Sequence, residues 1–213
     1  MLMIHEILAV GPLQCNCSII GDEASREAIV LDPGDDVEDV MELVRRHQLS
    51  VKQIVITHAH IDHVGGAMKL KRLTGAPILI NQNDYALLKM LDAQAGWVGM
   101  RPPGQVKIDQ SLGEGDKVRA GGLTGSVLYT PGHTEGSICL YFPADKMLFA
   151  GDTLFAGSIG RTDLPGGSYD KIMASLHGPV LSLPDDTIVV PGHGPLTTIG
   201  DERETNPFLL RRS

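Results

Sequence analysis

Residues 57–63 concentrate side chains that bind metal ions in proteins, because the segment reads Thr-His-Ala-His-Ile-Asp-His. His58 and His60 are two residues apart, so extended backbone projects both to the same side. Asp62 and His63 are adjacent and follow a turn of the chain toward a helix, so they can face a neighbouring point. One loop can therefore supply two ligands to one ion and two to another. The alternatives are a polar active loop without a metal and a chance cluster.

The types of side chain in this cluster narrow the choice of metal. Imidazole and carboxylate groups suit Zn²⁺, and they also suit iron and manganese. The segment contains no thiolate, which disfavours a purely structural zinc site. We therefore expect divalent ions, with zinc as the first choice and iron or manganese as alternatives.

Three further positions repeat the same arrangement, in which an apolar run ends in a turn and a potential ligand follows. His133 and His193 each follow a Pro-Gly pair, and Asp152 follows Ala150-Gly151. An aspartate after glycine is usually only a turn residue when it is considered alone. Together with the first cluster, these positions bring the set of potential ligands to five histidines and two aspartates.

A set of this size suits two metal ions. Catalytic zinc sites use about three protein ligands per ion and keep an open position for water or substrate. If one carboxylate is shared, seven ligands give four to each ion, and a hydroxide between the ions completes the coordination. Two-metal hydrolases hold their ions roughly 3.5–4 Å apart. The number of ligands thus predicts a binuclear centre that activates water.

The elements that must position these residues can be read from the hydrophobic pattern. Residues 28–31 form an apolar strand candidate that stops at the turn sequence Asp32-Pro33-Gly34, and residues 35–48 have the spacing of an amphipathic helix. Residues 51–56 are a nearly continuous β-branched run that leads directly into the first cluster, as expected for a buried strand.

The rest of the chain first alternates strands with helices and then consists mostly of strands. Residues 93–108 are rich in glycine and proline and are expected to be irregular, with a role as a lid over the site. This order favours an α/β fold, an αββα sandwich of two mixed β-sheets with outer helices. Expected helices span residues 67–73, 83–91 and 169–176, and expected strands span residues 77–80, 125–130, 138–142, 147–150 and 187–190.

The composition excludes several classes of function. The 213 residues are 42% apolar and 21% charged, and no repeat or change in composition divides them, so one domain spanning residues 1–213 is expected. The net charge of −8 and the aromatic content of 4% argue against a nucleic-acid binder. No apolar run reaches the roughly 20 residues of a membrane span, and the start lacks a basic leader. We expect a soluble cytoplasmic protein acting on a small molecule.

The remaining cysteines and histidines have structural explanations. Three cysteines do not make a disulfide framework, and Cys15 and Cys17 fit buried strand residues better than a metal-binding pair. His5 lies within an apolar strand candidate. His47 and His177 lie at expected helix ends, where they need no chemical role.

The motifs and their order resemble those of the metallo-β-lactamase superfamily. The resemblance extends over nearly the whole chain and implies its fold and its binuclear metal site. It also implies that Asp32 corresponds to an aspartate that orients a ligating histidine. The motifs that carry it are residues 57–63, 130–134, 151–153 and 191–194. The implied ligands are His58, His60 and His133 for the first metal, Asp62, His63 and His193 for the second, and Asp152 as the bridge.

Within this superfamily the chain most resembles hydroxyacylglutathione hydrolases of the glyoxalase II type, in particular the short bacterial form without a C-terminal helical domain. β-Lactamases of this fold generally lack a bridging carboxylate, so Asp152 argues against that activity. Arg161 takes the place of a lysine that holds glutathione in larger members, and Asp163 stands near the position of a tyrosine. Arg161 could pair with a substrate carboxylate or form a structural salt bridge. The segments that carry this resemblance are residues 151–155, 160–163, 164–167 and 206–208.

The resemblance implies a thioesterase that cleaves S-(2-hydroxyacyl)glutathione to a 2-hydroxy acid and glutathione, in which Asp62 helps to orient the nucleophile. Residues 160–163 also resemble persulfide dioxygenases, which share the fold and use a single iron. In those enzymes the last motif carries His-Asp-Tyr, whereas this chain has His193-Gly194-Pro195, which favours the hydrolase. Hydrolysis of a different ester, a lactone or a phosphodiester is also compatible with the resemblance.

Overall fold

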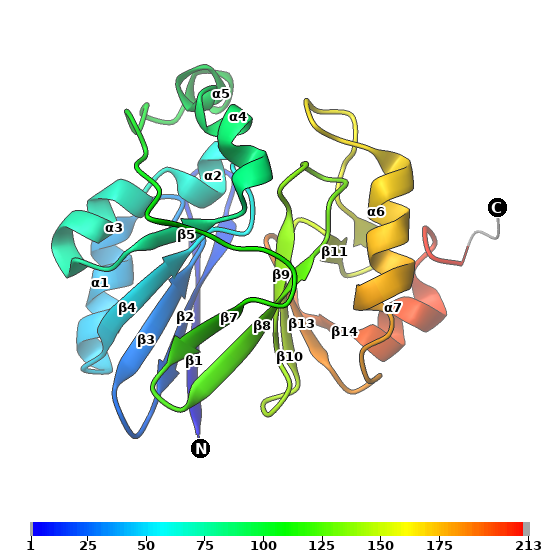
Figure 1. Ribbon diagram of the computed structural model, residues 1–213, viewed down its shortest axis with the longest axis horizontal. Helices are drawn as coiled ribbons and strands as arrows, with labels where there is room; N and C mark the ends of the chain where they lie inside the picture. Colours follow the sequence, from blue (N-terminus) through cyan, green and yellow to red (C-terminus); the bar gives the residue numbers. More distant parts are fainter. Residues whose placement is uncertain (1, 211–213) are drawn as a thin grey trace.

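Residues 2–210 are described by a computed structural model, in which two mixed β-sheets face each other (Figure 1). In the first sheet the strands follow the order of the chain. The pairs β1–β2 and β2–β3 are antiparallel, and the pairs from β3 to β6 are parallel. The six strands are β1 (Met3–Val10), β2 (Cys15–Asp22), β3 (Glu27–Leu31), β4 (Ser50–Val55), β5 (Ile78–Ile80) and β6 (Gln110–Ser111).

The second sheet has the strand order β14-β13-β10-β9-β8-β7. Its strands β10 and β13 are parallel, and its other neighbours are antiparallel. The six strands are β7 (Lys117–Ala120), β8 (Leu123–Tyr129), β9 (Ile138–Phe142), β10 (Met147–Gly151), β13 (Ile188–Pro191) and β14 (Thr197–Thr198). A separate small ribbon pairs β11 (Leu154–Phe155) with β12 (Ser158–Ile159).

Helices cover the outer face of each sheet. Helices α1 (Val37–Arg46) and α3 (Ala67–Thr74) lie against the first sheet, and α6 (Tyr169–Ser175) and α7 (Ile199–Thr205) lie beside the second (Figure 1). The predicted αββα sandwich of two mixed sheets is confirmed. No helix within residues 2–210 has both the length and the apolar character needed to cross a membrane.

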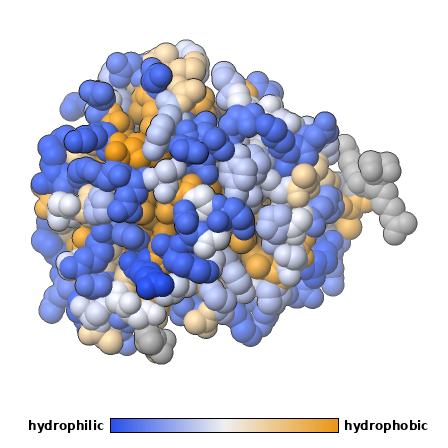
Figure 2. Space-filling model, in the orientation of Figure 1, coloured by the Kyte–Doolittle hydropathy of each residue, from blue (hydrophilic) through white to orange (hydrophobic). Residues whose placement is uncertain are grey.

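The alternation of side chains along the central strands fills three apolar layers. On β4, Ile54 packs into the layer beneath α1 and α3, whereas Val55 packs into the layer between the two sheets. On β10, Phe149 lies between the sheets and Leu148 lies in the layer beneath α6. Both faces of these strands are therefore buried, which explains why their sequences are nearly continuous apolar runs. The face of the molecule seen in Figure 2 is largely hydrophilic, with separate hydrophobic patches.

The structure corrects the expectation for residues 93–108. Instead of an irregular segment starting at residue 93, a helix α5 spans Leu91–Val98, and only the residues after Gly99 are irregular. Burial of Gln94 and Ala95 fixes this helix, and Gly99 ends it with a φ of 71°. The helix expected over residues 83–91 is instead two short pieces, the 3₁₀ turn Gln82–Asp84 and α4 (Tyr85–Leu88).

Candidate metal-binding site

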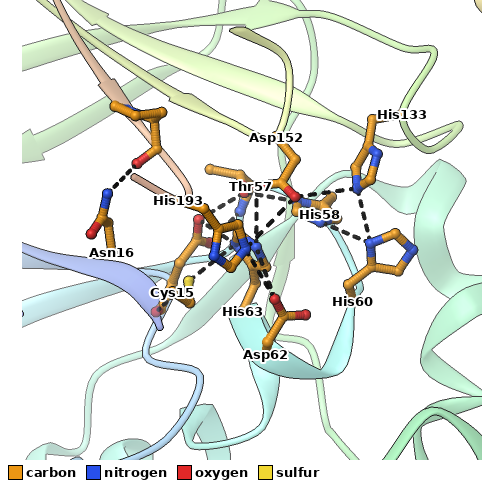
Figure 3. A network of polar contacts seen from close by, with 12 residues as sticks. Cys15, Asn16, Thr57, His58, His60, Asp62, His63, His133, Asp152 and His193 are labelled. Carbon is orange, nitrogen blue, oxygen red and sulfur yellow. Dashed lines mark hydrogen bonds and ion pairs between the residues drawn. The ribbon is translucent and has the colours of Figure 1, made fainter. Parts of the chain in front are cut away.

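The predicted site residues come together where several strands of both sheets end. Each follows the carboxyl end of a strand: Asp32 follows β3, the 57–63 loop follows β4, and His133 follows β8. Asp152 and His193 follow β10 and β13, which are neighbours in the second sheet. Figure 3 shows the ligand side chains converging on one small volume: His58, His60, Asp62, His63, His133, Asp152 and His193.

The first group of potential ligands consists of His58, His60 and His133, whose ring nitrogens lie within 4.8 Å of one another. Nδ1 of His60 lies 3.1 Å from Nε2 of His58 and 2.9 Å from Nε2 of His133. Burial lowers the pKa of His60 to about 4 and lowers that of His58 well below its ordinary value. Both imidazoles are therefore neutral at pH 7 and have a lone pair available for a metal.

The second group contains Asp62, His63 and His193. Oδ2 of Asp62 lies 3.1 Å from Nε2 of His193 and 3.6 Å from Nε2 of His63. Burial opposes ionisation of Asp62, but its two histidine neighbours outweigh burial and lower its pKa below the usual range. Asp62 is therefore a carboxylate at neutral pH.

Asp152 lies between the two groups. Its Oδ1 is 3.4 Å from Nε2 of His63, and its Oδ2 is 3.6 Å from Nε2 of His133 and 3.8 Å from Nε2 of His193. The carboxylate thus faces both sets of nitrogens. This is the position of a ligand that could serve two ions at once.

Three of the histidines are oriented by acceptors on their outer side. Nδ1–H of His133 donates to the carbonyl of Arg161 at 2.8 Å, and Nδ1–H of His193 donates to the carbonyl of Leu13 at 3.0 Å. Nδ1–H of His63 donates to Oδ2 of Asp32 at 2.9 Å. In a neutral imidazole the other nitrogen is then unprotonated, so all three Nε2 lone pairs point at the carboxylates of the site.

Lone pairs that face carboxylate oxygens repel each other unless a cation lies between them. Nε2 of His63 and Oδ1 of Asp152 are buried and have no hydrogen-bond partner, which is costly for polar atoms. Burial opposes protonation of His63, yet the carboxylates around it, Asp62 and Asp152 foremost, raise its pKa well above its ordinary value. The cluster therefore requires positive charge, and its nitrogen and oxygen donors fit divalent metal ions.

Asp32 is buried and ties the turn after β3 to the histidine loop. Besides His63, it accepts the backbone N–H of Thr57 at 2.7 Å and the hydroxyl of Thr57 at 2.7 Å. The same turn packs tightly against the site, because a Cβ at Gly34 would lie 1.5 Å from the carbonyl oxygen of Asp62. Only glycine fits at that position.

Sequence reasoning did not identify Asp84, a fully buried carboxylate at the end of the 3₁₀ turn. It accepts the N–H of Ala59 at 2.8 Å, the hydroxyl of Thr134 at 2.9 Å and the N–H of Gly136 at 2.6 Å. Burial raises the pKa of this carboxyl. Asp84 thereby joins the loop of His58 and His60 to the loop of His133. No motif surrounds it in the sequence, where it resembles an ordinary helix-start residue.

Cys15 also lies beside the site. Its Sγ is 3.5 Å from Nδ1 of His63, and with His63 and His193 it forms a further group of potential ligands. Burial raises the pKa of this thiol to about 12. All three cysteines are free and buried, so the expectation of no disulfide framework is confirmed.

A cavity of about 330 Å³ opens over the ligand cluster. His60, Asp62, His133, Asp152 and His193 form its polar part. The remaining lining is mostly apolar and comes from α4, α5 and their connection, the 57–63 loop, the β1–β2 turn and the segment after β12: Leu13, Ile61, Leu87, Met90, Gln94, Trp97, Val98, Arg161, Leu164 and Pro165.

Arg161 lines this cavity and also forms the structural salt bridge that the sequence left open. Its Nε and Nη2 each donate to Asp163 at 2.8 Å. The pair is largely exposed, with side-chain exposures of 60% and 69%. The three histidines outside the cluster have separate surroundings: His5 contacts Ser18, His47 contacts Glu6, and His177 lies in the turn after α6.

One relative by sequence and two solved structures show which known proteins this chain is similar to. Hydroxyacylglutathione hydrolase GloC of Haemophilus influenzae is 39% identical over 210 residues, covering 98% of this chain and 99% of that protein. The crystal structure of the B3 metallo-β-lactamase BLEG-1 has a TM-score of 0.90 and 38% identity, covering 98% of this chain and 100% of that one. TTHA1623, whose crystal structure is a di-iron-bound form, has a TM-score of 0.87 and 39% identity over 96% of this chain and 100% of that one.

The family model described as the metallo-β-lactamase superfamily matches residues 10–193, which include every residue of the ligand cluster. The match agrees with the four-layer fold and with the metal-ligand chemistry of the strand ends. The chain belongs to the metallo-β-lactamase superfamily.

Proposed function

We propose that the protein is a binuclear metal-dependent thioesterase of the glyoxalase II type. It cleaves S-(2-hydroxyacyl)glutathione to a 2-hydroxy acid and glutathione. One ion would be held by His58, His60 and His133 and the other by Asp62, His63 and His193, and Asp152 would be a ligand that both could share. Zinc is the first choice of metal, with iron or manganese as alternatives.

One observation carries this proposal. His63, His133 and His193 each commit Nδ1 to an outer acceptor and direct Nε2 inward, toward the carboxylates of Asp62 and Asp152. Such an arrangement is repulsive without cations and favourable with them. The outer acceptors fix each ring's tautomer and orientation, which is the usual support of histidine ligands in metalloenzymes.

The reaction adds water across the thioester, so that the acyl carbon gains a hydroxyl and the sulfur leaves as a thiolate that takes up a proton. When bound, two divalent ions would lower the pKa of a water between them and polarise the carbonyl. Asp62 lines the cavity as a carboxylate and can accept a hydrogen bond from the attacking water, which orients this nucleophile. Because a thiolate is a good leaving group, no further general acid is needed in the cavity wall.

The relatives support this assignment without deciding the substrate. The Haemophilus influenzae protein has the name of a hydroxyacylglutathione hydrolase, and TTHA1623 binds two irons in a chain that this one matches over nearly its whole length. BLEG-1 has the name of a B3 metallo-β-lactamase. A β-lactam is therefore the competing substrate that the test must include.

The direct test is a hydrolysis assay of the metal-loaded protein with S-lactoylglutathione, followed through release of free thiol, with a cephalosporin as the competing substrate. We expect turnover of the thioester with kcat/KM at least 100-fold above that for the β-lactam. The Asp152→Asn variant should lose at least 100-fold in kcat, because removing the shared carboxylate disrupts both halves of the centre. A preference for the β-lactam would overturn the thioesterase proposal.

The oxygenase alternative predicts a different result in the same protein. A persulfide dioxygenase would contain one iron per chain and would consume oxygen with glutathione persulfide. Measuring oxygen uptake with this persulfide, next to metal content, separates the two functions. We expect no oxygen uptake above that of the metal-free protein.

A further inference from the structure

The cavity above the ligand cluster has two unlike sides. Its floor carries the ligand side chains, and one wall is built from apolar residues of α4, α5 and the short connection between them. Leu87 lies on α4, Met90 lies between the helices, and Trp97 and Val98 lie at the end of α5. Leu13, on the β1–β2 turn, adds an apolar side chain that is 44% exposed.

The buried side chain of Gln94 connects this apolar wall to the loop of residues 57–63. Oε1 of Gln94 accepts the N–H of Ile61 at 3.0 Å, and its Nε2 donates to the carbonyls of Ala59 and Leu87 at 3.3 Å. Gln94 belongs to α5, and Ile61 begins the short helix that carries Asp62 and His63. The wall therefore keeps a constant position relative to the reacting centre.

Trp97 is unusual among the wall residues because its side chain is large and 66% exposed. An indole that lines a cavity and remains open to water gains contact area when an apolar ligand covers it. Single exposed apolar residues are common, but this one continues the surface formed by Met90 and Val98 beside a reactive site.

Outside the ligand cluster, the lining of the cavity is nearly uncharged. Outside the ligand cluster, Arg161 is the one charged residue among those described that line it. Its Nε and Nη2 are engaged by Asp163. An apolar chain next to the scissile bond would find a matched surface in this wall, and the carboxylates of a glutathione moiety would lie outside the wall.

We propose that the preferred substrate has an apolar chain next to the scissile bond, and that this chain lies against Leu87, Met90, Trp97 and Val98. The proposal rests on the proposed hydrolase function and names the substrate class of that site. The apolar chain of the substrate belongs either to its acyl group or to its thiol, because either one would make the same apolar contacts with the wall. Trp97 is then a residue that determines specificity by contact with the substrate.

The test uses two matched series of thioesters with the metal-loaded protein. In one series the acyl group grows from acetyl to decanoyl on a constant thiol, and in the other the thiol grows on a constant acyl group. We expect kcat/KM to rise about two- to fourfold per methylene in one series, as burial of methylenes predicts. The series in which kcat/KM rises identifies whether the acyl group or the thiol lies against the wall.

Variants of the wall locate the effect. Trp97→Ala should reduce the gain in kcat/KM per methylene, so that its kcat/KM falls further below that of the unmodified protein as the apolar chain lengthens. Tyr85→Ala is the matched control, because this exposed aromatic residue lies on α4 but lines a neighbouring groove that does not contain the ligand cluster. We expect that variant to keep the full dependence on chain length.

Fluorescence gives a second readout that does not depend on turnover, since Trp97 is the single tryptophan of the chain. Titration with linear carboxylates, the products of the acyl series, should shift its emission to shorter wavelength with an affinity that rises with length. Met90→Ala should weaken this binding.

The outcomes separate this proposal from the function on which it rests. If thioesters are hydrolysed with no dependence on chain length in either series, and Trp97 emission does not respond, the apolar-wall proposal is wrong and the thioesterase stands. If no thioester is hydrolysed while long carboxylates still bind at Trp97, the proposed function fails and the apolar specificity survives. If kcat/KM rises equally with chain length in Trp97→Ala and in the unmodified protein, the proposed role of this wall is also wrong.

Discussion

At the scale of single residues, the site is defined by where each imidazole proton lies. The Nδ1 atoms of His63, His133 and His193 face Asp32 and two backbone carbonyls, so their Nε2 atoms are the ones directed inward. That geometry makes metal binding depend on the groups behind the ligands as much as on the ligands themselves. Asp84 extends the same principle to the backbone, since it holds Ala59 and Gly136 on two different loops.

Replacement of Asp84 tests this positioning role. Asp84→Asn places an amide group among three donors, so at least one donor is left without an acceptor and the two histidine loops separate. We expect metal affinity at the first site to fall roughly 10–100-fold, measured by competition with a chromophoric chelator, with a changed visible spectrum of the cobalt-substituted protein. Asp92→Asn, on the exposed side of α5, is the control and should change neither quantity. Unchanged metal affinity in Asp84→Asn would contradict the role.

At the scale of elements, most of what positions the site could be read from the sequence. Apolar runs such as residues 51–56 and 147–150 marked the strands, and the ligands after them marked the edge where those strands end. The contact of α5 with the 57–63 loop could not be predicted, because no sequence pattern indicates that Gln94 is buried and hydrogen-bonded. Residues 93–98 looked irregular because Gly96 lies within them, and tertiary burial of Ala95 outweighed that low propensity.

Replacing each of two glycines with alanine should change the free energy of unfolding in opposite directions. Gly34→Ala would place a Cβ against the backbone of Asp62, so the 57–63 loop must move, and we expect a loss of about 2–4 kcal/mol in the free energy of unfolding. Gly96→Ala meets open space within α5 and should gain about 0.5–1 kcal/mol. Urea denaturation of the two variants measures both values. Equal effects in the two variants would contradict the close approach at Gly34.

His5 on β1 gives the fold a specific dependence on pH. Burial lowers its pKa from 6.5 to about 4, so between these values the unfolded chain binds more protons than the folded one. The free energy of unfolding therefore falls as pH falls through this window and gains nothing from His5 above it. Relative to His5→Gln, the metal-free protein should lose about 1–2 kcal/mol between pH 6.5 and 4.5, after allowance for partial exposure. Parallel pH profiles of the two proteins would contradict this assignment.

At the scale of the whole molecule, the two sheets pack against each other through an apolar layer, and the ends of their strands bring opposite halves of the centre together. His58, His60 and His63 come from the first sheet's side, and His133, Asp152 and His193 come from the second. The inter-sheet layer, with Phe142 and Phe149 in edge-to-face contact at 5.7 Å, sets the distance between these halves. Metal binding should therefore stabilise the packing of one sheet against the other.

Removal of metal tests this coupling. Because an ion bound only by the folded state stabilises it by mass action, chelation should lower Tm, and added zinc should restore it. An excess of zinc at about 100 times its dissociation constant corresponds to roughly 2.7 kcal/mol. Scanning calorimetry of the protein and of Asp152→Ala measures the effect, and the variant should show a smaller response to chelation. Equal responses would mean that Asp152 does not contribute to the bound ions.

The metal centre as a whole is proposed to hold two ions with Asp152 between them. Anomalous X-ray scattering from crystals of the metal-loaded protein measures this directly. We predict two peaks roughly 3.5–4 Å apart, one beside His58, His60 and His133 and the other beside Asp62, His63 and His193, both in contact with Asp152. A single peak, or two peaks that Asp152 does not touch, would contradict the binuclear account.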